Sequence, residues 1–304
     1  MKTGIVGILY NTAKLDITHP AGWNHILKEI MFPDAEFLTE NNNWHDFDQL
    51  VICHGLNYKE KSYNIVGGVG EAHYKRLKML YNFKGKILSF DNFDIKDFIK
   101  YKKVDFNWDK EWSYEKITLP KKDKIVYGDS HSISIWPNSE YEISRNDGKT
   151  LYSFLKDPID LDHYRYNDII LYFGNIDVRH HLCRTKEPVV ETMKLFNKYI
   201  DYALDLNATV VNLLPIESEE RRIPKTGQYK GTNFSGSREQ RQMLVYLAND
   251  LMNSTEGLKT ITWPQEWYDN INYYEKEIME RTQSVHIKPR YYRKNITCEQ
   301  VSLF

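Results

Sequence analysis

Three short segments place reactive side chains directly after an apolar run. The first, KIVYGDSHS, puts Ser130 between an aspartate and a histidine. The second, DIILYFGNIDVRHH, carries an amide, a carboxylate, an arginine and two histidines between residues 174 and 181. The third, VVNLLPIE, ends at Glu217. Residues just past the carboxyl ends of parallel strands converge on one crevice, so we expect these three turns to share a site.

Ser130 is the candidate nucleophile of this set. A serine hydroxyl attacks well only when a base removes its proton and hydrogen-bond donors stabilise the resulting oxyanion. The candidate bases are His131, His180, His181 and, far downstream, His286. His131 is adjacent in sequence and is expected to point away from Ser130, so a distant histidine returning to the same end of the sheet fits better. The competing interpretation is that Asp129 and Ser130 only cap a helix.

The order of these residues resembles the SGNH/GDSL hydrolase superfamily over about residues 122–292. The matching blocks are GDS at 128–130, GKT at 148–150, GNID at 174–177 and the late pair His286-Ile287. The resemblance implies that Ser130 is the nucleophile and His286 the general base. It also implies that the backbone amides of Ser130 and Gly148 donate to the oxyanion, with Asp129, His131 and Asn175 lining the substrate site.

The segment YFGNIDVRHHL is similar to an FGEIDxRxH variant of SGNH-like domains that are associated with polysaccharide and phage genes. That likeness singles out Asp177, Arg179 and His181, with Arg179 holding an anionic group. An alternative for the first two residues is a simple ion pair. The sequence departs from the superfamily at Gln283, where the family has an aspartate, and at Ile176, where it has an asparagine. These departures keep open a remodelled transfer site or a non-catalytic binding module.

A cationic, glycine-rich segment between residues 221 and 237 is the second candidate for substrate binding. Arginine forks and free backbone amides bind phosphate oxygens, so this segment could clamp an anionic substrate. A solvated surface loop is the equal alternative. The four cations concerned are Arg221, Arg222, Lys225 and Lys230.

We predict no metal and no cofactor. A metal site built from Asp177, His181 and Cys183 would lack a fourth ligand at a diagnostic spacing. The three cysteines of the chain show no CxxC spacing, which fits a reducing compartment and a cytoplasmic protein. The first apolar run is about six residues long, too short to cross a membrane.

Alternating apolar segments predict an α/β protein made of two Rossmann-like or flavodoxin-like three-layer units, each with a mostly parallel sheet. We place a first domain at 1–115 and an SGNH-like domain at 116–304, separated by a charged, irregular stretch at 97–124. The expected strands are 4–9, 35–38, 47–55, 86–90, 124–128, 168–173 and 208–216. The expected helices are 22–30, 71–83, 149–156, 189–204 and 238–253.

Residues 1–95 are similar in layout to the amino-terminal half of T-even phage DNA β-glucosyltransferases. The likeness lies in the order FDQLVICHGLN, Gly-Gly, a helix and KGKILSFDN. It implies an acceptor-binding role for the first domain.

Composition limits the function classes. The 41 Lys and Arg residues nearly balance 42 Asp and Glu, so no overall basic field favours non-specific nucleic-acid binding. The 22 tyrosines and seven tryptophans could line a carbohydrate or base-stacking surface, although aromatic residues filling a core are commoner. We expect a small-molecule, carbohydrate or nucleotide substrate, with DNA as a further candidate, and no membrane partner.

Three functions fit these observations. The leading hypothesis is ester hydrolysis or group transfer by Ser130 and His286 on a carbohydrate, nucleotide or modified base. The second is a phage-type DNA-modification transferase in which Asp177 or His181 acts as general base. The third is a non-catalytic SGNH-like binding module.

Overall fold

The computed structural model describes residues 1–7, 19–53, 71–90, 114–118, 120–136, 140–158, 166–217, 235–280 and 285–294. The chain divides into two compact units, Met1–Leu119 and Pro120–Phe304. Each unit is an α/β fold built on a five-stranded, all-parallel sheet flanked by helices, which confirms the predicted fold class.

The first unit has the strand order β2-β1-β3-β4-β5. Helix α1 packs on β1 and β3, and α2 contributes Leu80 to a core cluster that includes Trp44, Leu50 and Ile52. Its strands are β1 (Thr3–Val6), β2 (Glu36–Leu38), β3 (Gln49–Cys53), β4 (Lys86–Phe90) and β5 (Glu115–Ile117), and its helices are α1 (His19–Met31) and α2 (Glu71–Asn82).

The second unit has the strand order β11-β10-β9-β6-β8. Its strands are β6 (Lys124–Gly128), β8 (Tyr141–Arg145), β9 (Asp168–Tyr172), β10 (Thr209–Val211) and β11 (Lys259–Ile261). Its helices are α4 (Leu151–Lys156), α5 (Asn175–His180), α6 (Pro188–Asp205), α7 (Arg238–Ser254), α8 (Gln265–Asp269) and α9 (Ile271–Tyr273). A short parallel pair joins β7 (Ile135–Trp136) to β12 (Arg293–Lys294).

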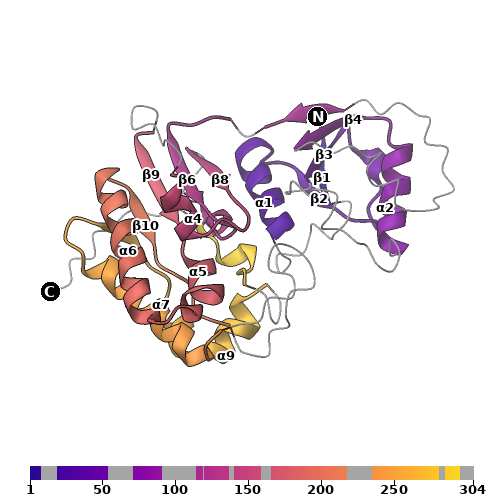
Figure 1. The fold of residues 1–304 in the computed structure, drawn as a ribbon. Coiled ribbons are helices and arrows are strands. Elements are labelled where there is room, and N and C mark those ends of the chain that lie inside the picture. The colour runs from indigo at the N-terminus through magenta and orange to yellow at the C-terminus, as the bar shows by residue number, and fades with distance from the viewer. Residues whose placement is uncertain are drawn as a thin grey trace. The chain divides into compact units, whose positions relative to one another are not determined.

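Helices α6 and α7 lie side by side over one face of the second sheet (Figure 1). Alternate strand residues such as Tyr127 and Leu171 point into this layer and are buried with Phe196 and Leu244. On the opposite face the ring of Tyr172 meets that of Trp263, 6.2 Å away between centroids. Helix α7 begins directly after Ser237, its N-cap residue, which forms a capping box with Gln240 as the sequence signature indicates.

Counted along the chain, both sheets have the order 2-1-3-4-5, which is the flavodoxin-like arrangement. In this order the second strand lies on one side of the first strand, and the third, fourth and fifth strands lie on its other side. The resulting switch point lies between the first and third strands, where ligands bind in such sheets. In the second unit the switch point falls between β6 and β9.

Five strands were not predicted, namely β5, β8 and β11 of the two main sheets and the two-residue strands β7 and β12. Strand β5 lies inside the stretch expected to be irregular, and it is largely exposed at the edge of the first sheet. Strand β8 buries only Tyr141 and Ile143, and β11 is three residues long. Edge strands and short strands carry little of the apolar pattern on which sequence prediction depends.

The predicted strand 208–216 is wrong in its length, because β10 ends at Val211. The N–H of Asn212 still donates to Ile261 of β11 at 2.9 Å, but three buried residues beyond it donate their backbone N–H groups to side chains. Leu213 donates to Asn249, Leu214 to Asn175 and Ile216 to Gln242, at 2.8–3.0 Å. A buried backbone donor must find some partner, and here three side-chain amides supply it.

Candidate active site

Ser130 lies two residues beyond β6, at the switch point of the second sheet. In the register of the sheet, Gly128 is the partner of Tyr172 on β9 and of Arg145 on β8. A side chain on Gly128 would place its Cβ 2.3 Å from the Tyr172 carbonyl oxygen. The close approach of β6 and β9 therefore requires glycine, and it sets Ser130 at the strand end.

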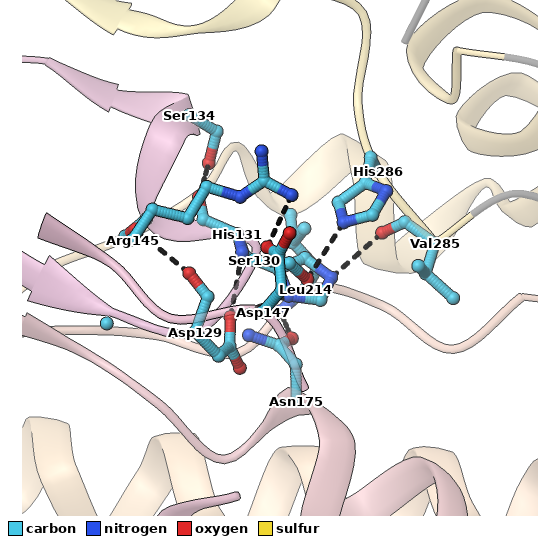
Figure 2. A network of polar contacts seen from close by, with 12 residues as sticks. Asp129, Ser130, His131, Ser134, Arg145, Asp147, Asn175, Leu214, Val285 and His286 are labelled. Atoms are coloured by element: carbon cyan, nitrogen blue, oxygen red, sulfur yellow. Dashed lines mark hydrogen bonds and ion pairs between the residues drawn. The ribbon is translucent and has the colours of Figure 1, made fainter. Parts of the chain in front are cut away.

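The hydroxyl of Ser130 contacts the distant histidine. His286 Nε2 lies 2.9 Å from Ser130 Oγ, across 156 residues of sequence (Figure 2). Both side chains are partly exposed, so a substrate can reach them. This distance is within the hydrogen-bond reach that a general base needs toward its nucleophile.

Backbone pairing holds His286 against the segment 278–280. Met279 and Ile287 form an antiparallel bridge. On either side of it, the His286 carbonyl accepts from the N–H of Glu280 at 3.0 Å, and Lys288 donates to Ile278 at 2.8 Å. Ile287 is buried, so the neighbouring His286 side chain faces the other way in this short extended segment.

A second histidine, His131, links the serine turn to the same segment. Its Nδ1 lies 2.8 Å from Asp129 Oδ1, and its Nε2 lies 3.0 Å from the carbonyl oxygen of Val285 (Figure 2). The rings of His131 and His286 are 4.9 Å apart between centroids. His131 and Asp129 are both buried. This buried chain of contacts ends at the residue that precedes His286.

The interpretation that Asp129 and Ser130 cap a helix is wrong for both residues. Asp129 Oδ1 accepts from the backbone N–H of His131 at 2.8 Å, as an aspartate does in a local turn. The 3-10 helix that follows, Ser132–Ser134, has no side-chain cap. The Ser130 hydroxyl is directed at His286 instead.

Asn175 brings an amide to the neighbouring strand end. It follows Gly174, whose φ of 103° and close contact with the Phe196 ring require glycine. Asn175 Oδ1 accepts from the Leu214 N–H at 3.0 Å, which fixes the amide plane. Its buried Nδ2 faces the Tyr172 hydroxyl: burial raises the pKa of Tyr172, and the contact from Asn175 opposes that shift. The adjacent Ile176 is buried as an apolar residue.

The GKT block forms the turn between β8 and α4. Gly148 has a φ of 75°, and Thr150 caps α4 by accepting from the Ser153 N–H.

Sequence reasoning missed the arginine just before this turn. Arg145 has a side chain that is 4% exposed and pairs with Asp147 at 2.5 Å, within the network of Figure 2. Its position opposite Gly128 could have been found only from the register of β8, a strand that was not predicted.

Asp177 holds the start of helix α4. Its two carboxylate oxygens accept the backbone N–H groups of Leu151, at 2.7 Å, and Tyr152, at 3.1 Å. Burial raises the pKa of Asp177 to about 7, and these two N–H donors oppose the shift. His181 ends α5 with an exposed side chain, and its backbone N–H donates to the Asp177 carbonyl.

Arg179 is buried and forms its ion pair with Glu217, at 2.8 Å from Nε to Oε2. Its other nitrogens donate to the carbonyl oxygens of Asn175 and Pro215, both at 3.3 Å. The structure thus joins the second and third predicted turns through this pair. The alternative of an ion pair between Asp177 and Arg179 is wrong, because Arg179 pairs with Glu217.

Several predicted site residues lie outside the described residues. These are Arg221, Arg222, Lys225 and Lys230 of the cationic segment, together with Gln283 before the late histidine. Cys183 is a free, partly buried cysteine. Among the described residues, no group of three or more histidine, cysteine, aspartate or glutamate side chains is arranged to hold a metal ion. Within those same ranges, no helix has the length and apolar character needed to span a bilayer.

Comparison with known proteins gives little beyond this geometry. No protein-family model matches the chain, and no curated protein matches it. One solved structure that is similar to part of the chain is described as "BT4096 a gut microbial diltiazem-metabolizing enzyme". The two share 15% identity and a TM-score of 0.35, over 55% of this chain and 44% of that one. At this level of similarity, no argument about function can rest on the likeness.

Proposed function

We propose that the second unit is an enzyme that hydrolyses or transfers an ester-linked acyl group through Ser130. The observation that carries the proposal is the 2.9 Å contact between Ser130 Oγ and His286 Nε2 at the switch point of the sheet. An accessible serine hydroxyl in contact with an imidazole nitrogen is the arrangement that makes serine nucleophilic.

The proposed reaction uses these two groups in turn. Ser130 Oγ attacks the acyl carbon while its proton moves to His286 Nε2. The tetrahedral oxyanion then collapses, the bond to the leaving alcohol breaks, and His286 returns the proton to that alcohol. Water or an acceptor hydroxyl, deprotonated by His286, releases the acyl group from the serine.

Oxyanion stabilisation is assigned to the backbone N–H of Ser130 and to Nδ2 of Asn175. A buried amide whose orientation is fixed by its own oxygen is preorganised for a developing negative charge. Gly148, the third donor of the SGNH-like set, lies in the turn after β8.

His131 has a positioning role in this proposal. Both of its ring nitrogens face acceptors, Asp129 Oδ1 and the Val285 carbonyl. The Asp129–His131 pair holds the backbone next to His286, so that the base keeps its distance to Ser130.

A carbohydrate, nucleotide or modified base remains the proposed substrate class. The alternative DNA-modification transferase is supported less well, because both oxygens of Asp177 already accept backbone N–H groups. A non-catalytic binding module would not need the contact between Ser130 and His286.

A fluorophosphonate probe tests the proposal, because it reacts covalently with activated serines. The wild-type protein should be labelled at Ser130, and Ser130→Ala should abolish the labelling. Ser254→Ala, which changes an exposed serine at the end of α7, is the matched control and should label like the wild type. An unlabelled wild-type protein, or labelling that survives Ser130→Ala, would rule out the serine mechanism.

A further inference from the structure

A second concave surface lies at the carboxyl ends of β10 and β11, on the side of the sheet away from β8. This groove has a volume of about 970 Å³. Asn212 follows β10 and Trp263 follows β11, and both line the groove. Arg293 of β12 contributes from the segment that also carries His286.

One stripe of helix α7 forms a wall of the groove. Met243, Tyr246, Asp250 and Asn253 recur at steps of three and four residues and therefore share a face of the helix. The opposite stripe, which includes Leu244 and Ala248, is buried in the core. Tyr246 is 45% exposed and Met243 is 49% exposed. Large apolar side chains left exposed in a groove are a typical feature of a binding surface.

Polar atoms in this groove are left without partners. Asn212 is 4% exposed, yet its Oδ1 has no hydrogen-bond partner among the described residues. The same holds for Asn253 Oδ1 and Arg293 Nε. Burying a polar atom without a partner costs free energy, so these atoms are suited to hydrogen-bond a ligand.

Two other polar residues of the groove already form hydrogen bonds within the protein. Asn249 accepts from the Leu213 N–H and donates to the Leu213 carbonyl. Tyr268 donates to the same carbonyl at 2.5 Å. These contacts hold the strand end in place, so the unpartnered atoms belong to a fixed surface.

The available groups define the chemistry of a ligand. Two amide oxygens accept hydrogen bonds, one guanidinium nitrogen donates, and the exposed ring of Tyr246 offers an apolar face. Asp250 and Arg293 are of opposite charge, and the Arg293 guanidinium also donates to the Thr262 carbonyl and lies 5.9 Å from the Trp263 ring. The groove therefore offers no net charge for a phosphate.

We propose that this groove is a sugar-binding site. A pyranose ring has hydroxyl groups that both donate and accept, and a C–H face that packs on an aromatic ring. The proposal does not depend on chemistry at Ser130, because binding to the groove is measured without turnover.

The test is saturation-transfer NMR with glucose, galactose, N-acetylglucosamine and lactose as probes, with adenosine and cytidine as competing ligand types. At least one sugar should bind wild-type protein and Ser130→Ala equally. Tyr246→Ala and Asn253→Ala should each weaken that binding about 5-fold or more, in line with the loss of one ring or polar contact. Tyr152→Ala, at an exposed tyrosine on α4 outside the groove, is the matched control and should not change it.

Three outcomes would overturn the sugar site. One is no saturation transfer from any of the four sugars. Another is sugar binding that neither Tyr246→Ala nor Asn253→Ala weakens. The third is binding of the nucleosides alone, which would make the groove a base-stacking surface. Loss of fluorophosphonate labelling at Ser130 would leave the sugar site unaffected, so the two proposals fail separately.

Discussion

The turn after β6 and the helix after β9 carry polar side chains to the same end of one sheet, yet they use them differently. Ser130 and His286 contact each other through their side chains and stay partly exposed. Asp177 and Arg179 are buried, and they bind backbone groups and an ion-pair partner. On the proposed mechanism, a polar residue in a strand-end turn can serve either the reaction or the fold, and its partners distinguish the two.

The largest expected difference between these two regions concerns His286. We expect His286→Gln to lower the rate of fluorophosphonate labelling about 100- to 10,000-fold, because a side chain that is not a base replaces the general base. His181→Ala should label at the wild-type rate. Labelling that is lost in His181→Ala but kept in His286→Gln would move the base to α5 and reverse the assignment.

The ion pair between Arg179 and Glu217 should affect stability rather than labelling. Glu217→Ala leaves the Arg179 guanidinium buried without its partner, and we expect the free energy of unfolding in urea to fall by about 3–5 kcal/mol. The double variant Arg179→Met with Glu217→Leu removes both charges and should recover much of that loss. A Glu217→Ala protein with unchanged stability but lost labelling would place the pair in the reaction instead.

Replacing Asp177 should also lower the stability of the protein and leave its labelling unchanged. In Asp177→Asn one of the two oxygens becomes an NH₂ group facing a backbone N–H, so we expect a loss of about 1–3 kcal/mol in urea unfolding. Thr150→Ala, which removes the side-chain cap of the same helix, should cost about 1 kcal/mol. Folded Asp177→Asn protein should still be labelled; failure to label would support a role for Asp177 as a base.

The positioning role of His131 predicts an intermediate result. Asp129→Asn combined with His131→Phe removes the buried pair without leaving one charge alone. We expect labelling to slow about 10- to 100-fold, because His286 loses the contact that holds its neighbour. His131→Gln keeps one N–H donor for the Val285 carbonyl and should slow labelling less. Equal labelling rates in the wild type, the double variant and His131→Gln would show that the backbone hydrogen bonds of His286 and Lys288 are enough to position the base.

A further expected effect is the pH dependence of stability contributed by Asp177. Its pKa is raised to about 7 by burial, so the folded protein binds this proton more tightly than the unfolded chain does. Such a group stabilises the fold at pH values below its unfolded pKa of about 4, and the stabilisation is lost as the pH rises to about 7. The urea midpoint of the wild type relative to Asp177→Asn should fall over that range and then level off. A flat difference would contradict the raised pKa.

Much of the fold could be predicted because buried strands and amphipathic helices leave a strong apolar pattern. The strands at 86–90 and 124–128 have the predicted bounds. The segment after β10 could not be predicted as it is, because side-chain amides of Asn249, Asn175 and Gln242 replace a neighbouring strand there. Apolar patterns report burial, but they do not report which group satisfies a backbone donor.

Residue order along the chain was enough to predict which residues share the site. It was not enough to predict which side chain each of them contacts. The proximity of Ser130 and His286 followed from the order of the blocks. The partner of Arg179 required the structure, although Asp177 could have been set aside because residues two apart on a helix do not face each other. The contact from His131 to Val285 joins two irregular segments, and no periodic pattern marks either of them.

The distance in sequence between Ser130 and His286, 156 residues, also has a consequence for synthesis. Strands β6, β8, β9 and β10 and helix α6 all precede the segment that carries the histidine. A nascent chain can therefore build most of the second sheet while its serine still lacks a base. On the proposed mechanism, reactivity arises only when the last segment docks, so labelling of Ser130 would report that folding has finished.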